Sequence, residues 1–225
     1  MRVRIKRQET ASSKPYWQEF NYDREDDKTV AGMLDDINGR EIIKDVGGNV
    51  TSRIEWECSC MQGMCGACAM VINNKPALAC EYFLRDVKKD TLTIEPLKVF
   101  PTVADLVVDR DIILESFKKE NVYIEEFKGT ESEEYENMYL AGKCLKCGLC
   151  LEVCPNYNRG RKFYGAAFAN DCYLVKSRSK TNGDSIKKSY RKHFENYCSK
   201  SLSCADVCPV NITTLASIAR MNRTH

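Results

Sequence analysis

The sequence lacks the features that would place it in a membrane or send it through one. No apolar run approaches the roughly 20 residues that a helix needs to cross a bilayer. The first residues, Met1–Arg7, alternate basic and apolar side chains and contain no apolar core of a signal peptide. Any membrane contact is therefore expected to involve a partner or the surface of the protein.

Other absences narrow the function further. The sequence contains no catalytic triad and no glycine-rich nucleotide loop. The formal net charge is only +2, and nothing in the charge pattern indicates a nucleic-acid partner. With 225 residues, the chain is long enough for two modest domains, each small enough to benefit from a metal cluster as an internal cross-link.

Cysteine is the residue that the sequence has in excess, with 13 among 225 residues. An odd number of cysteines without a secretory signal favours metal ligation over disulfides, which are a feature of short secreted chains. We therefore expect an intracellular protein in a reducing compartment, carrying metal cofactors.

The densest cysteine motif is KCLKCGLCLEVCP, from Lys143 to Pro155. Its spacing is C-x2-C-x2-C-x3-C-P. Three closely spaced thiolates can hold three corners of one cubane cluster, whereas the fourth cysteine can ligate a second cluster. A zinc site needs only four ligands, usually in two separated pairs, and is the weaker alternative. The motif comprises Cys144, Cys147, Cys150 and Cys154.

A second cysteine group ends in the same way, at Cys208-Pro209, but has Ser201 where the first group has its second cysteine. If each last cysteine crosses to the other cluster, one set of four thiolates and one set of three result. The set of four predicts a [4Fe-4S] cluster on Cys144, Cys147, Cys150 and Cys208. The set of three predicts a [3Fe-4S] cluster on Cys154, Cys198 and Cys204.

Two residues are alternatives for a fourth ligand at the second of these clusters. The oxygen of Ser201 could bind a fourth iron, although it is a poorer ligand than a thiolate. Cys172 could also serve, but its segment, Phe163–Val175, is typical of a packed helix. We therefore expect Cys172 to be a buried free thiol.

The amino-terminal half contains a third motif, C-x4-C-x2-C followed by a separate cysteine, which is the plant-type [2Fe-2S] arrangement. Gly63 and Gly66 would let backbone N–H groups approach the cluster, the alternative being ordinary turn glycines. Cys58 is surplus, and we expect a strand residue facing away or a small buried filler rather than a substitute ligand. The predicted ligands are Cys60, Cys65, Cys68 and Cys80.

Periodicity in the first half predicts strands and a helix. Val3 and Ile5 alternate with basic residues, and Tyr16, Phe20 and Tyr22 share one face of the next segment, which indicates a hairpin. Apolar spacing predicts an amphipathic helix over Thr29–Asn38 with Thr29 as N-cap and Gly39 at its end. Further strands are expected at Met70–Ile72 and Thr91–Glu95.

The second half is expected to be helical, after a connection at Glu95–Pro101. Thr102 is predicted to cap a helix containing Val103, Leu106 and Val107. Glu131–Glu136 is interpreted as an acidic loop, and Ile212–Ala219 as a helix with Ile212, Leu215, Ala216 and Ala219 facing the core. The predicted fold class is α+β, with domains at residues 1–101 and 102–225.

At this point the chain resembles the iron–sulfur subunit of the succinate dehydrogenase and fumarate reductase family over almost its whole length. The resemblance rests on Ser59-Cys60, on Cys65 to Met70, on Leu78-Ala79-Cys80, on Phe100-Pro101 with Asp105 to Asp109, on Cys144 to Pro155 and on Cys204 to Pro209. It implies a β-grasp plant-type ferredoxin domain followed by an all-helical bacterial-ferredoxin-like domain, binding [2Fe-2S], [4Fe-4S] and [3Fe-4S] clusters.

The resemblance also implies a function and partners. Electrons would pass between a flavoprotein subunit that carries FAD, where succinate and fumarate interconvert, and a quinone beside membrane-anchor subunits. The [2Fe-2S] domain would face the flavoprotein and the [3Fe-4S] cluster would lie nearest the quinone, on the cytoplasmic side of the cell membrane. A related flavoprotein complex acting on another substrate, a soluble multi-cluster carrier and a zinc-stapled scaffold are the alternatives.

The sequence departs from the family at the quinone side. Many succinate-oxidising members have a tryptophan shortly after the Cys-Pro that corresponds to Cys154-Pro155, whereas Asn156-Tyr157-Asn158 follows here. This favours menaquinone-linked fumarate reduction. His193 is either a histidine near the quinone or a surface histidine, and the basic residues from Lys162 to Lys192 suit either anionic lipid headgroups or a solvated helix face.

Overall fold

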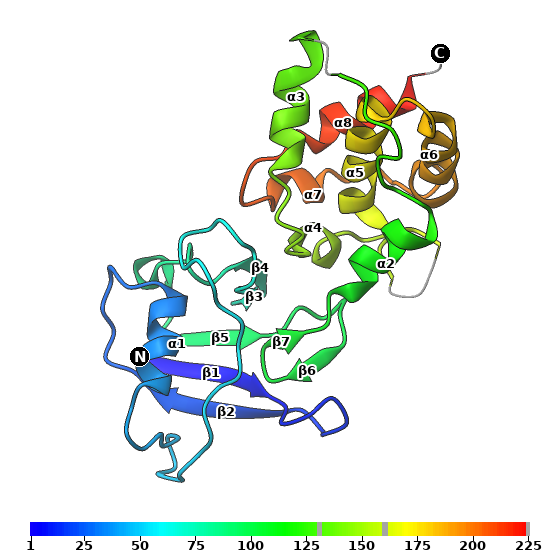
Figure 1. The fold of residues 1–225 in the computed structure, drawn as a ribbon. Helices are drawn as coiled ribbons and strands as arrows, with labels where there is room; N and C mark the ends of the chain where they lie inside the picture. Colours follow the sequence, from blue (N-terminus) through cyan, green and yellow to red (C-terminus); the bar gives the residue numbers. More distant parts are fainter. Residues whose placement is uncertain (130–131, 159–161, 224–225) are drawn as a thin grey trace. The chain divides into compact units, whose positions relative to one another are not determined.

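The computed structural model describes residues 1–129, 132–158 and 162–223. The chain divides into two compact units, Met1–Asp109 and Arg110–His225. The first unit is built on a β-sheet and the second on α-helices (Figure 1), so the chain is a mixed α+β protein, as predicted.

The first unit contains a five-stranded mixed sheet in the order β2-β1-β5-β3-β4. Its central pair, β1 and β5, is parallel, and the other neighbours are antiparallel. The predicted hairpin is present, and Val3, Ile5 and Phe20 are fully buried between polar neighbours. β4 was not predicted. The strands are β1 (Arg2–Arg7), β2 (Tyr16–Asn21), β3 (Ala69–Ile72), β4 (Lys75–Leu78) and β5 (Thr91–Glu95).

Helix α1 (Val30–Asn38) begins and ends as the sequence predicts. The Thr29 hydroxyl accepts a hydrogen bond from the Gly32 backbone N–H at 3.2 Å, which satisfies one of the free amides of the first turn. Val30, Met33, Leu34 and other apolar residues of one face are fully buried. A short 3-10 helix, Leu84–Asp86, precedes β5.

The helix predicted at Thr102 is absent, because this segment forms a small antiparallel hairpin of β6 (Thr102–Ala104) and β7 (Val107–Val108). Asp105 occupies the turn with a left-handed φ of 43°, which is incompatible with the first turn of a helix. The expected connection at Glu95–Pro101 also belongs to the first unit, where Leu97 and Phe100 are buried.

The second unit consists of short helices around α5 (Gly165–Arg178), which contacts most of the others. The remaining helices are α2 (Asp111–Lys119), α3 (Ser132–Gly142), α4 (Leu149–Glu152), α6 (Gly183–Tyr190) with a π-helical continuation at Arg191–Glu195, α7 (Ser203–Asp206) and α8 (Thr214–Asn222). The expected acidic loop at Glu131–Glu136 is therefore helical from Ser132 onwards, while Glu131 lies outside the described residues. None of the helices within the described ranges is both long and apolar enough to span a membrane.

The core of the second unit confirms one expectation and corrects another. Cys172 is completely buried on α5 among aromatic and aliphatic side chains, as predicted for a free thiol. On α8, however, Leu215 is 45% exposed, and the buried face carries Thr214, Ser217 and Met221 instead. A polar contact sets this orientation, because the Ser217 hydroxyl donates to Asn170 Oδ1 at 3.1 Å inside the core.

Candidate iron–sulfur sites

The strand register of the first unit brings two of the four predicted [2Fe-2S] ligands together. Ala69 on β3 pairs with Leu78 on β4, so Cys68 and Cys80 lie just beyond the same end of this ladder. Their Sγ atoms are 3.4 Å apart. Cys60 and Cys65 form a second contacting pair in the preceding loop. The four thiols are thus arranged as two pairs.

Backbone N–H groups of the loop point at these sulfurs. Gly63 N lies 3.2 Å from Cys80 Sγ, and Met64 N lies 3.2 Å from Cys60 Sγ. Gly63 has a φ of +72°, and a Cβ built there would come within 2.8 Å of Glu81 Oε1. The left-handed backbone therefore favours glycine at this position, and a larger residue would also displace the Glu81 side chain.

The thiols of this site differ in their acidity. Hydrogen bonds from the backbone N–H of Gln62 and its neighbours lower the pKa of Cys60 to about 7. Burial, together with the adjacent Cys68, raises the pKa of Cys80 to about 12. Because metal ligands must be thiolates, a metal that binds this set has to displace a proton from the buried member at neutral pH.

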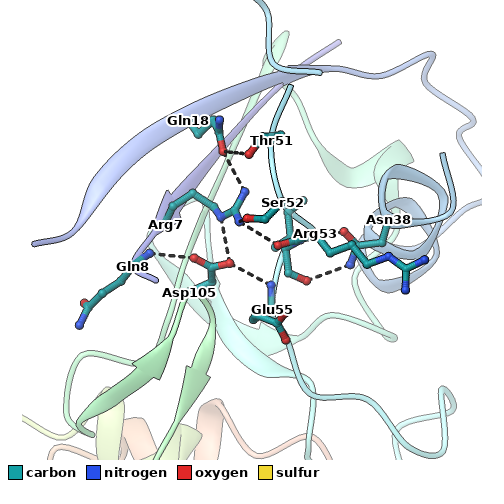
Figure 2. A network of polar contacts seen from close by, with 10 residues as sticks. Arg7, Gln8, Gln18, Asn38, Thr51, Ser52, Arg53, Glu55 and Asp105 are labelled. Atoms are coloured by element: carbon teal, nitrogen blue, oxygen red, sulfur yellow. Dashed lines mark hydrogen bonds and ion pairs between the residues drawn. The ribbon is translucent and has the colours of Figure 1, made fainter. Parts of the chain in front are cut away.

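A buried ion pair anchors the segment that leads into the cysteine loop (Figure 2). Arg7 Nε lies 2.9 Å from Asp105 Oδ2, and both side chains are only 2% exposed. The other Asp105 contacts are to backbone amides, since its carboxylate accepts from Gln8 N at 2.8 Å and from Glu55 N at 2.9 Å. Arg7 also donates to the carbonyl oxygen of Arg53. The pair thereby joins β1, the 52–55 segment and the β6–β7 turn.

In the second unit, the two cysteine groups share one backbone pattern. Lys146 and Gly148 in the first loop have φ values of 55° and 87°, and Lys200 and Leu202 in the second have 58° and 63°. Short helices follow at α4 and α7. The same pattern of turn hydrogen bonds recurs, for example from Cys154 N to Leu151 O and from Cys208 N to Ala205 O. Ser201 therefore occupies the position that Cys147 has in the first loop.

Two cavities lie beside these loops, and each is lined by cysteines from both loops. The first cavity is lined by Cys144, Cys147, Cys150 and Cys208, which is the predicted set of four. The second is lined by Cys154, Cys198, Cys204 and Ser201, which contains the predicted set of three. Cys204 also borders the first cavity, and Ala166 of α5 borders both.

Burial dominates the acidity of these thiols. It raises the pKa of Cys147 to about 11 and that of Cys150 well above its usual range, and it also raises the pKa of Cys204. Backbone hydrogen bonds act in the opposite direction on Cys147, from Leu149, and on Cys204, from Ala205. The Cys208 Sγ also accepts one, from Ile212 N at 3.4 Å. The thiols are therefore held in surroundings that disfavour a free thiolate and would favour one neutralised by metal.

Sequence reasoning missed a charged pair beside the first cavity. Lys146, which lines this cavity, places its Nζ 2.5 Å from Asp171 Oδ1 on α5. Burial acts to lower the pKa of Lys146, but the Asp171 carboxylate and the Cys144 thiol outweigh it, and the pKa is raised. A lysine between two motif cysteines and a lone acid in the apolar stretch of α5 were the signals available in the sequence.

Two other residues lie differently from the expectations. His193 is not on the surface: it is 4% exposed, its Nε2 lies 2.8 Å from Glu120 Oε1, and its ring stacks on Tyr164 at 4.0 Å. Cys58 is exposed and lies outside any strand, so it is neither a strand residue nor a buried filler.

The donor sets fit iron–sulfur clusters in their chemistry. The predicted ligands are all sulfur atoms, amide N–H groups are directed at several of them in both units, and glycine occupies a tight left-handed position of the first loop. Within the ranges that the structure describes, no three His, Cys, Asp or Glu side chains converge as they would around a single metal ion.

Comparison with known proteins assigns a class to this arrangement. Residues 2–115 match the 2Fe-2S iron-sulfur cluster binding domain, and residues 141–212 match the 4Fe-4S dicluster domain. The chain is thus an iron–sulfur protein with cluster-binding domains in both halves, and its function is electron transfer.

The relatives identify the family. The chain is 32% identical to the succinate dehydrogenase iron-sulfur subunit of Bacillus subtilis, over 99% of this chain and 91% of the relative. It is 30% identical to the fumarate reductase iron-sulfur subunit of Escherichia coli O6:H1, over 78% and 75%. It belongs to the family of iron–sulfur subunits of succinate dehydrogenase and fumarate reductase.

A solved structure supports the fold. A chain of the Mycobacterium smegmatis Sdh1 complex in the apo form superposes with a TM-score of 0.74 at 21% identity, covering 98% of this chain and 92% of that chain. At this identity the likeness concerns the fold alone.

Proposed function

We propose that this chain relays electrons between a flavoprotein subunit that carries FAD, where succinate and fumarate interconvert, and a membrane quinone. The observation that carries the proposal is that both cysteine groups of the second unit contribute thiols to each of two cavities, while the first unit has a separate set of four thiols. When bound, the clusters would accept and release single electrons. The chain itself performs no dicarboxylate chemistry.

The ligand assignment follows the sets that the fold brings together. Cys60, Cys65, Cys68 and Cys80 hold the [2Fe-2S] cluster, and their arrangement as two pairs suits a cluster whose two irons each need two thiolates. The first cavity holds the [4Fe-4S] cluster and the second the [3Fe-4S] cluster, on the cysteines that line them. The sheet order of the first unit supports a β-grasp plant-type ferredoxin fold, and the repeated loops of the second support a bacterial-ferredoxin-like fold.

Ser201 is the residue that sets the nuclearity of the third cluster. It has the backbone position of Cys147 but an oxygen in place of sulfur, so the iron at that corner lacks a soft ligand. Electron paramagnetic resonance of the anaerobically purified protein should show a [3Fe-4S] signal when oxidised, and [2Fe-2S] and [4Fe-4S] signals when reduced. Two [4Fe-4S] signals in the reduced protein, without a [3Fe-4S] signal in the oxidised protein, would contradict the assignment.

Substitutions sharpen this test. Cys154→Ala should remove the oxidised [3Fe-4S] signal and leave the reduced [4Fe-4S] signal, because Cys154 borders only the second cavity. Ser201→Cys should convert the oxidised signal into a second reduced cubane signal. Cys172→Ala is the matched control, since this buried thiol lines neither cavity and should leave every signal in place.

The partners are a flavoprotein beside the first unit and membrane-anchor subunits beside the second. Apolar side chains are exposed next to both sites: Met64 on the first cysteine loop, and Leu202 and Leu215 at the second cavity. We place the complex on the cytoplasmic side of the cell membrane. Purification through a tag on this chain should recover flavin and an apolar subunit, and their absence would contradict the proposal.

The quinone is menaquinone and the direction is fumarate reduction. Asn156 follows Cys154-Pro155 and donates a hydrogen bond to the carbonyl oxygen of Tyr197, next to Cys198, so this segment is tied to the second cysteine loop without a tryptophan. The purified complex should reduce fumarate faster with a menaquinol analogue than with a ubiquinol analogue. The opposite preference would overturn this part of the proposal.

A further inference from the structure

A charged pair borders the cavity that Cys144, Cys147, Cys150 and Cys208 line. Lys146 lies within the cysteine loop and itself lines this cavity. Its Nζ is 2.5 Å from Asp171 Oδ1, and the two side chains are 30% and 17% exposed. The lysine ammonium also lies 5.5 Å from the centroid of the Phe117 ring. The pair is therefore held in partly desolvated surroundings next to the sulfurs.

The second cysteine loop provides an internal comparison. Lys200 occupies the position that corresponds to Lys146, with nearly the same left-handed backbone. It is exposed, and the described part of the chain shows no carboxylate in an ion pair with it. Two lysines thus have the same local geometry and each borders a cavity, but one is fixed by an acid from α5 whereas the other is exposed.

We propose that Lys146 and Asp171 set the reduction potential of the [4Fe-4S] cluster. The inference rests on the proposed assignment of that cluster to the first cavity. Reduction adds one negative charge to a cluster, and a nearby ammonium stabilises the reduced form more than the oxidised form. The Asp171 carboxylate opposes this effect and holds the lysine in place. Partial burial reduces screening by water and salt, so both charges act on the site more strongly than fully exposed charges would.

The two charges predict shifts of opposite sign. Lys146→Gln removes the positive charge and should lower the midpoint potential. Asp171→Asn removes the opposing charge and should raise it. Each change should alter the ratio of reduced to oxidised cluster about tenfold at the wild-type midpoint, as expected for a partly compensated charge in surroundings of intermediate polarity. For a one-electron couple this corresponds to about 59 mV.

The experiment is a redox titration of the whole protein, followed by the electron paramagnetic resonance signal of the reduced [4Fe-4S] cluster. The double variant with Lys146→Gln and Asp171→Asn should return close to the wild-type midpoint. Lys146→Arg keeps the charge and should also stay there. Lys200→Gln is the matched control, since its solvated charge should leave the [4Fe-4S] midpoint unchanged.

Shifts of the same sign in Lys146→Gln and Asp171→Asn, or no shift in either, would show that the pair serves packing only and would overturn the inference. If Lys146→Gln fails to load the cluster, a raised midpoint in Asp171→Asn with an unchanged midpoint in Lys146→Arg still supports it. The absence of any reduced [4Fe-4S] signal in the wild type would refute the cluster assignment itself, which is a separate result.

Discussion

At the scale of single residues, left-handed backbone marks the loops that present cysteines. Lys146, Lys200 and Leu202 all have φ values between 55° and 63°. A residue with a Cβ pays roughly 1–2 kcal/mol for this conformation. The first loop has glycine at Gly148, where the second has Leu202, so the second loop keeps a strained and 45% exposed leucine beside its cavity. Strain of this kind is concentrated at functional sites.

Gly165, the first residue of α5, gives a prediction about packing. It has a φ of +79°, and a Cβ built there would lie 2.2 Å from Leu151 Cδ2. Gly165→Ala should therefore destabilise the second unit by about 2–4 kcal/mol, through left-handed strain and overpacking against α4.

Thermal unfolding at a fixed scan rate measures this effect. Gly129→Ala is the matched control, because a Cβ at Gly129 would meet no atom within 4 Å. If the melting temperature falls equally in both variants, overpacking against Leu151 does not contribute to the loss of stability.

At the scale of elements, the Arg7–Asp105 pair gives a prediction about the first unit. Arg7→Met would leave the Asp105 carboxylate buried without its countercharge, which typically costs about 3–5 kcal/mol. For a unit of this size, the melting temperature should fall by more than roughly 10 °C.

Arg4→Met is the control on the same strand. The Arg4 side chain is 43% exposed, and its ion pair with Glu19 has a separation of 3.8 Å. Such an exposed pair contributes at most about 1 kcal/mol. Equal losses in the two variants would contradict a special role for the buried pair.

The contacts of α1 with the segment that follows β2 make the stability of the first unit depend on pH. Asp36 on α1 accepts hydrogen bonds from Lys28 and from the Tyr22 hydroxyl, and these lower the pKa of its carboxyl group. Burial and the bond to Asp36 also raise the pKa of Tyr22 to about 12. Because the Asp36 pKa is lowered on folding, its stabilisation is present above the unfolded value of about 4 and is lost as the pH falls below it.

Asp36→Asn should therefore lower the melting temperature by a constant amount from pH 7 to pH 5. Below about pH 4 the difference from wild type should shrink towards zero. Asp35→Asn, at the neighbouring exposed position of the same helix, should change little at any pH. A difference that grew towards acid would contradict the assigned sign.

At the scale of the whole molecule, iron content tests the three clusters together. The cluster formulae add up to about nine irons per chain. Ser201→Cys should raise this to about ten, with no zinc in either protein. Metal analysis of the anaerobically purified protein, combined with acid-labile sulfide, provides the measurement. Zinc without iron would support a zinc-stapled scaffold instead.

Much of the fold can be predicted from the sequence because the interactions that determine it are between residues close together in the chain. Cysteine spacing groups three thiols of the first loop, and these line one cavity in the structure, whereas the crossing of Cys154 and Cys208 follows the two-cluster ferredoxin pattern and not local spacing. Helix α1 followed from its cap and its apolar face. The hairpin at Thr102 could not be predicted in this way, because its turn depends on the ion pair between Asp105 and Arg7, which are nearly a hundred residues apart in the chain. The burial of His193 and the Lys146–Asp171 pair likewise depend on partners distant in the chain.

The crossing of the two cysteine groups has a consequence for synthesis on the ribosome. Each cavity is lined by thiols from both loops, and Cys208 completes the first of them. On the proposed ligand assignment, neither cluster site of the second unit can close before the second cysteine loop, residues 198–208, has been made. The first cysteine loop therefore has to wait for the second during translation. Cluster delivery to this half would have to wait until Cys208 has been made, whereas the first unit has all of its predicted ligands by residue 80.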